Sequence, residues 1–93
     1  EYQRDDWIPI GGNDDATSYL PSNSALAATF NRKRALESGT ILGREARGRG
    51  KDMILAPGIN IHRSPLGGRN FEYMSEDPYL TAEIAVPFVE GIQ

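Results

Sequence analysis

A dense set of polar side chains lies in the second half of the chain, and one arginine in it follows a pair of glycines. Gly67 and Gly68 allow the backbone to bend sharply just before Arg69. A guanidinium presents its N–H donors in a fixed fork, which suits adjacent sugar hydroxyls or a carboxylate. From the residue types alone, two interpretations stay open. Arg69 binds a ligand, or it forms a salt bridge with Glu72 or Glu76 that holds this loop in shape.

The acidic residues nearby suggest acid/base chemistry. Glu72 and Glu76 are candidates for the carboxylate pair of a glycoside hydrolase, in which the two groups lie roughly 5 to 9 Å apart depending on mechanism. The sequence leaves that distance open. Asp77 stands directly before a proline, which is the order expected of a helix cap. His62 is the only histidine, and metal sites need several ligands, so we predict a structural hydrogen-bonding role for it and no metal site.

The composition excludes several other classes of site. The chain has no cysteine, so disulfides and Cys-based metal sites are excluded. The glycine pair is not followed by the Gly-Lys-Ser/Thr of a phosphate-binding loop, and no G-x-S-x-G sequence of a serine nucleophile is present. We predict no cofactor. The formal net charge of −3 disfavours nucleic-acid binding. No apolar stretch approaches the about 20 residues that span a bilayer.

Two helices are predicted in the first half of the chain. Ser22 or Asn23 caps a short helix that includes residues 25–28. Asn31 is the N-cap of a longer helix over about 32–47, which Gly48 and Gly50 end. Small residues predominate along one face of the longer helix and predict close packing against a sheet. That face carries Ala35, Gly39, Leu42 and Ala46.

A short apolar run at residues 53–56 follows this helix, and its flanking Gly and Pro predict a buried strand. A helix, a glycine turn and a buried strand form an αβ unit of a parallel sheet. The long loop at residues 57–76 therefore begins at the carboxyl end of a strand, where α/β proteins build their active sites. A last helix starts at Asp77-Pro78, with a local kink predicted at Pro87. Its apolar face carries Leu80, Ile84, Phe88 and Ile92.

At this loop the sequence resembles family 3 glycoside hydrolases. Residues 55–73, LAPGINIHRSPLGGRNFEY, resemble the family stretch GPGVNIHRxPLGGRNFEY, and residues 75–80 resemble its SEDPYL. Upstream, LAATF at 26–30 resembles LAATW, and GREAR at 43–47 resembles GEEAR. The resemblance runs from about Leu20 to Gln93. In residues 1–19 we identify no motif of the family, and we predict a surface loop of unclear assignment there.

The resemblance implies that residues 1–93 are an internal fragment of an N-terminal (β/α)₈-type barrel domain. The expected fold class is α/β, with mostly helices, one or two short buried strands and a long loop. Enzymes of this family remove terminal β-linked glucose or a related sugar with retention, using an Asp nucleophile and a Glu acid/base. By resemblance, Arg69 matches the family arginine that hydrogen-bonds sugar hydroxyls in the −1 subsite. Glu72, Glu76 and Asp77 match residues that brace that loop.

The same resemblance places the bond-breaking residues outside this sequence. We therefore predict no catalytic residue here, a carbohydrate as the substrate of the parent enzyme, and the remainder of the parent chain as a partner. The 93 residues alone are expected to be inactive, and a periplasmic or secreted location fits the family. The alternative function is a non-catalytic, small α/β module that binds a sugar or an anion and folds by itself.

Overall fold

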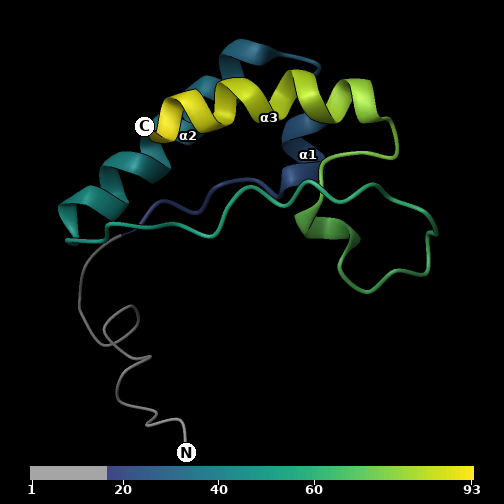
Figure 1. Cartoon of the computed structure of the whole chain (residues 1–93), viewed down its shortest axis with the longest axis horizontal. Coiled ribbons are helices and arrows are strands. Elements are labelled where there is room, and N and C mark those ends of the chain that lie inside the picture. The colour runs from purple at the N-terminus through teal and green to yellow at the C-terminus, as the bar shows by residue number, and fades with distance from the viewer. Residues whose placement is uncertain (1–16) are drawn as a thin grey trace, which may run out of the picture.

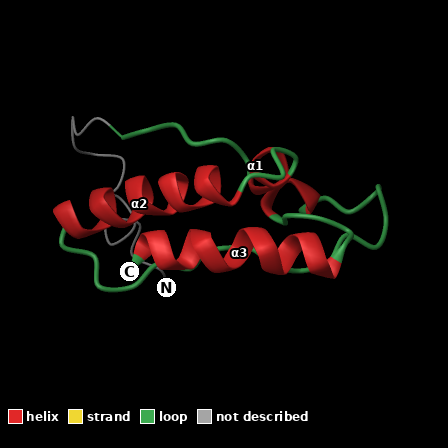
Figure 2. Ribbon diagram, turned by 90° about the horizontal axis from the view of Figure 1, so that it is seen from above, coloured by secondary structure: helices red, strands yellow, loops and turns green. Residues whose placement is uncertain are grey.

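The computed structural model describes residues 17–93. In that range the order of elements is α1 (Asn23–Ala27), α2 (Arg32–Gly48), the short 3₁₀ helix η3 (Asn70–Glu72) and α3 (Pro78–Ile92). α2 and α3 lie side by side, and a long irregular segment joins them (Figure 1, Figure 2). Most of the predicted loop at 1–19 lies outside the described residues, and 17–19 form neither helix nor strand.

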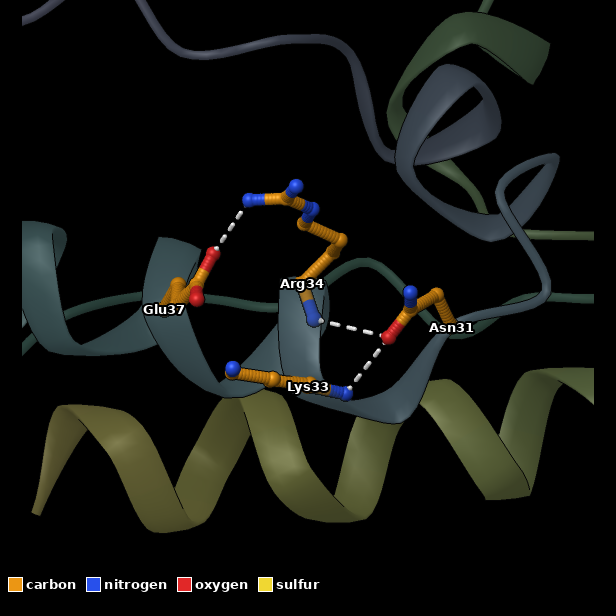
Figure 3. A network of polar contacts seen from close by, with 4 residues as sticks. All are labelled: Asn31, Lys33, Arg34 and Glu37. Carbon is orange, nitrogen blue, oxygen red and sulfur yellow. Dashed lines mark hydrogen bonds and ion pairs between the residues drawn. The ribbon is translucent and has the colours of Figure 1, made fainter.

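α2 begins where the sequence predicts. The side-chain oxygen of Asn31 accepts hydrogen bonds from the main-chain N–H groups of Lys33 (3.0 Å) and Arg34 (3.2 Å), as Figure 3 shows. These N–H groups have no acceptor within the helix, so the cap stabilises its first turn. One turn further, Arg34 donates to Glu37 over 2.9 Å. Both side chains of this pair are exposed, so it contributes at most about 1 kcal/mol.

The predicted N-caps of α1 and α3 are confirmed as well, whereas α1 ends at Ala27, one residue before the predicted end. Ser22 Oγ accepts from the N–H of Ala25 (3.3 Å) at the start of α1, and Asp77 Oδ1 accepts from the N–H of Tyr79 (3.0 Å) at the start of α3. α2 extends one residue beyond the predicted end. Gly50 follows it with φ of 67°, a left-handed conformation that glycine adopts without strain.

The two long helices run parallel to each other. Their contacts advance together along both helices, from Arg32–Glu83 through Gly39–Phe88 to Gly43–Ile92. Two consecutive helices can be parallel only if the segment between them returns along their full length, and Figure 1 shows it doing so beneath them. This is the course that the chain takes in an αβα unit, where the returning segment is a strand.

Glycines allow α2 and α3 to approach closely. A Cβ atom at Gly39 would lie 2.1 Å from the carbonyl oxygen of Phe88, and one at Gly91 would lie 2.4 Å from the carbonyl oxygen of Leu36. The predicted stripe of small residues on α2 is therefore a close-packing surface. The predicted partner is wrong, because among residues 17–93 this surface meets a helix and no sheet.

A small core lies between the helices and the segment before α3. Its buried apolar residues come from all three α-helices and from the loop: Leu26, Ala27, Ala35, Met74, Ile84 and Phe88. Leu80 and Ile92 pack against this core, so the predicted apolar face of α3 is confirmed. α3 stays helical through Pro87, where the sequence predicts a kink.

The predicted buried strand at residues 53–56 is wrong for the described chain. Residues 17–93 contain no strand, and the side chains of Met53 and Leu55 are 80% and 97% exposed. An apolar run becomes a buried strand only when neighbouring strands supply its hydrogen-bond partners and cover its faces. Residues 53–56 run along the two long helices, as a strand of an αβα unit would. Within residues 17–93, however, no neighbouring strand pairs with them.

Candidate functional site

The loop between α2 and α3 is closed on itself by main-chain contacts. Gly58 and Tyr73 form an isolated parallel bridge, and the N–H of His62 donates to the carbonyl oxygen of Ser75 over 3.2 Å. A Cβ atom at Gly58 would lie 2.4 Å from the carbonyl oxygen of Glu72, so a glycine lets the two arms of the loop meet. The loop predicted at 57–76 is thus a folded feature with its own hydrogen bonds.

The tip of the loop is organised by one asparagine. Asn70 Nδ2 donates to the carbonyl oxygen of Ser64 over 2.7 Å, and the N–H of Gly67 donates to the same oxygen over 3.2 Å. A Cβ atom at Gly67 would lie 2.6 Å from Asn70 Oδ1, whereas one at Gly68 meets nothing within 4 Å. Of the glycine pair before Arg69, Gly67 is therefore the one that the local packing requires.

Arg69 lies at the start of the turn that η3 forms, and its guanidinium pairs with the carboxylate of Glu72. We call residues 69–73 the arginine turn. Arg69 Nε donates to Glu72 Oε1, which is one of the two salt bridges considered from the sequence. The Arg69 side chain is 74% exposed and that of Glu72 is 32% exposed. The pair fixes the direction of the guanidinium while leaving its outer edge in solvent.

This pairing decides which chemistry Glu72 can perform. The hydrogen bond from Arg69 lowers the pKa of the Glu72 carboxyl below its usual value and raises the pKa of Arg69. A general acid needs a raised carboxyl pKa, so that it still carries a proton near neutral pH. Glu72 is the opposite case, a carboxylate kept ionised. The geometry favours Glu72 as an orienting group for Arg69 over a proton donor.

The other acidic residues of the loop are placed differently. Asp77 accepts the N–H of Tyr79 as the N-cap of α3, as the sequence predicts. Glu76 is exposed, and its carboxylate makes no ion pair within residues 17–93. Arg69 and Glu72 are therefore brought together, whereas Glu76 points to no partner in the described chain.

His62 belongs to the same loop, and its ring centroid lies 6.3 Å from that of Tyr73. Its main-chain N–H makes the hydrogen bond to Ser75, but its Nε2 atom is buried and has no partner in the described chain. The structural hydrogen bond predicted for the His62 side chain is therefore not made by Nε2 within residues 17–93. Residues 17–93 contain no group of three potential ligands that could hold a metal ion.

Two residues make contacts with the arginine turn that the sequence did not predict, although Asn23 was considered there as a cap of α1. Asn23 and Ser24, at the start of α1, donate hydrogen bonds to main-chain carbonyls of the turn. They lie 46 to 49 residues before their acceptors, which is beyond the reach of any local pattern. One signal in the sequence was the excess of polar residues at the start of α1. A helix needs one capping residue, and Ser22 already fills that position.

A hollow of about 880 Å³ lies at the opposite end of the two long helices. It is lined by the C-terminal parts of α2 and α3 and by Lys51, Asp52 and Ile54, and it includes no residue of the arginine turn. The hollow and the polar side chains of the arginine turn therefore lie in different parts of the molecule, and the arginine turn is the candidate site. Across residues 17–93, no helix is both long and apolar enough to cross a membrane.

The fold and the loop agree with the comparison to known families. The family described as the glycosyl hydrolase family 3 N terminal domain matches residues 10–93. The chain belongs to glycoside hydrolase family 3 and corresponds to part of its N-terminal domain.

The similar proteins are β-glucosidases. β-Glucosidase BoGH3A of Bacteroides ovatus is 47% identical over 93 residues, which are 100% of this chain and 12% of that protein. A β-glucosidase of Ruminococcus albus is 52% identical over 73 residues, covering 78% of this chain and 8% of that protein. The structure of β-glucosidase 3B from Thermotoga neapolitana in complex with α-D-glucose matches with a TM-score of 0.82 and 46% identity, over 89% of this chain and 12% of that one. The chain thus spans a small part of the length of its relatives.

Proposed function

We propose that this chain is part of a retaining β-glucosidase and that Arg69 binds hydroxyls of the terminal glucose. The observation that carries the proposal is the state of the guanidinium. Its Nε donates to Glu72, and within residues 17–93 no other group is bonded to it, so Nη1 and Nη2 keep their donors for a ligand. A fixed cationic fork with free donors suits a pair of neighbouring sugar hydroxyls.

The place of the arginine turn supports this role. It follows the returning segment and directly precedes α3, as Figure 1 shows. In (β/α)₈ barrels the active site is built from the loops between the carboxyl ends of the strands and the helices that follow. We propose that residues 53–56 occupy one strand of such a barrel in the complete enzyme. The remainder of the chain then supplies the neighbouring strands, the nucleophile and the acid/base.

The relatives support the substrate class. Three of the similar proteins are named β-glucosidases, and one similar structure contains glucose. This favours the enzyme over the small sugar- or anion-binding module predicted as the alternative.

The test is the substitution Arg69→Ala in the complete enzyme, assayed with an aryl β-glucoside. Loss of charge-assisted hydrogen bonds costs about 1.5 to 3 kcal/mol, so we expect kcat/KM to fall about 10- to 100-fold. Arg34→Ala is the matched control, because Arg34 is an exposed arginine on α2 whose side chain pairs, within residues 17–93, only with Glu37. Its kcat/KM should equal that of the wild type. An unchanged kcat/KM in Arg69→Ala would contradict the proposal.

A further inference from the structure

The start of α1 is bonded to the arginine turn across a long sequence distance. Ser24 Oγ lies 2.9 Å from the carbonyl oxygen of Asn70 and 2.7 Å from that of Tyr73, and Asn23 Nδ2 donates to the carbonyl oxygen of Glu72 over 2.6 Å. Ser24 has a single hydroxyl proton, which the carbonyl oxygens of Asn70 and Tyr73 share, and Asn23 adds a bond to the carbonyl oxygen between them. All of these bonds are partly buried, so water is a poor substitute for them.

The arginine turn has little support of its own. It is a single turn of 3₁₀ helix whose first residue has no side-chain cap. Its own main-chain bonds run from Glu72 N to Arg69 O and from Tyr73 N to Asn70 O, both 3.2 Å. Short 3₁₀ turns have poor hydrogen-bond geometry and need support from their surroundings. In the described chain α1 adds to the support that the Gly58–Tyr73 bridge and the bond from Asn70 to Ser64 give within the loop.

We propose that Asn23 and Ser24 are positioning residues of the sugar site, which hold the arginine turn in the conformation that presents Arg69 to the sugar. The inference rests on the proposed role of Arg69. The path is short, because Asn23 fixes the main chain of Glu72 and the carboxylate of Glu72 orients the guanidinium. A shift at Glu72 therefore displaces both the turn and the group that aims Arg69.

The first experiment measures kcat and KM of the complete enzyme on an aryl β-glucoside after Ser24→Ala. Misplacement of a binding group by about 1 Å can lower activity by as much as 100-fold, and we expect kcat/KM to fall by about tenfold. Ser22→Ala is the matched control, since it removes the cap of α1 without touching the turn, and it should stay within about twofold of wild type. Ser24→Thr keeps the hydroxyl and should recover most of the loss.

A second variant separates positioning from folding. Asn23→Asp has nearly the same shape, and a carboxylate at the first position of a helix is favourable, so α1 is retained. The substitution replaces the donor with an acceptor that repels the carbonyl oxygen of Glu72. We expect a loss in kcat/KM similar to that of Ser24→Ala, with the helical circular dichroism of the wild type.

The decisive measurement is the same Ser24→Ala substitution in an Arg69→Ala background. If Ser24 acts through Arg69, its tenfold effect should shrink to less than about twofold there. An equal loss in both backgrounds means a general structural role and overturns this inference, as does wild-type kcat/KM in Ser24→Ala and Asn23→Asp. In either case the proposed function stands, provided that Arg69→Ala is impaired. Wild-type activity in Arg69→Ala instead refutes the proposed function and this inference with it.

Discussion

Because α2 and α3 approach closely at Gly39 but not at Gly48, we expect a Gly→Ala substitution to change stability in opposite directions at these two positions of α2. Alanine favours a helix interior over glycine by about 0.5 to 1 kcal/mol. At Gly48 a new Cβ atom meets nothing within 4 Å, so Gly48→Ala should be neutral or slightly stabilising. At Gly39 it would lie 2.1 Å from the Phe88 carbonyl oxygen, about 1.3 Å inside the 3.4 Å at which ordinary contact begins.

The clash at Gly39 cannot be relieved by a rotamer change, because the obstructing atom belongs to the backbone of α3. The two helices must separate, and that disturbs the buried contacts of Ala35 and Phe88. Overpacking of this kind costs about 1 to 3 kcal/mol, and more when backbone must move, which exceeds the helix-propensity gain. We expect Gly39→Ala to destabilise the domain by about 1 to 3 kcal/mol.

The assay is thermal unfolding of the complete enzyme, followed by circular dichroism and by loss of activity. For a domain of 150 to 250 residues, roughly 1 kcal/mol shifts Tm by about 2 to 4 °C, so Gly39→Ala should lower Tm by about 2 to 12 °C. Gly48→Ala should leave Tm unchanged or raise it slightly. A Tm for Gly39→Ala at or above wild type, or an equal fall for Gly48→Ala, would refute the packing argument.

Two further predictions concern single polar groups. Thr81 is buried, and its Oγ1 has no partner within residues 17–93. Thr81→Val should therefore leave the free energy of unfolding unchanged or raise it by about 1 kcal/mol. The measurement is Tm, and a lower Tm in the variant would contradict this prediction. The pKa of Glu72 is lowered by its hydrogen bond from Arg69, so the pair is intact above the usual carboxyl range and is lost as pH falls through the lowered pKa. The NMR titration midpoint of the Glu72 carboxyl should therefore rise in Arg69→Ala, and an equal midpoint in both proteins would show that the pair does not form.

The helix ends could be predicted from the sequence because capping is local. Ser22, Asn31 and Asp77 each accept an N–H group two or three residues further along the chain. The residue type and its position before an apolar pattern are then sufficient. The apolar face of α3 follows from the same kind of short-range periodicity.

The strand expected at residues 53–56 is not formed within the described chain, since a strand depends on partners that a local pattern does not contain. Met53 and Leu55 have the composition of a buried strand, yet both are exposed in the described chain. The spacing of the small residues of α2 was enough to recognise a packing surface. It did not identify the element that covers this surface, which is α3. Periodicity defines a face, and only the three-dimensional arrangement defines its partner.

The site was predicted in part. The sequence left Arg69 between a ligand and a salt bridge with Glu72 or Glu76, and the structure shows the pair with Glu72. Its role in sugar binding stays a prediction. The contacts from Asn23 and Ser24 were missed, because nothing in a sequence of polar residues near a helix start indicates which distant carbonyls they meet.

The bonds from α1 to the arginine turn also bear on the order in which the chain folds. They join residues up to 49 positions apart, so they form only after the whole α2 region and the returning segment have been brought together. Contacts of such sequence separation carry a larger loop-closure cost than local ones and form late. We expect the caps of α2 and α3 to form early and the arginine turn to become ordered last. The amide protons of the turn should then exchange with solvent in the same opening event that separates α1 from the loop.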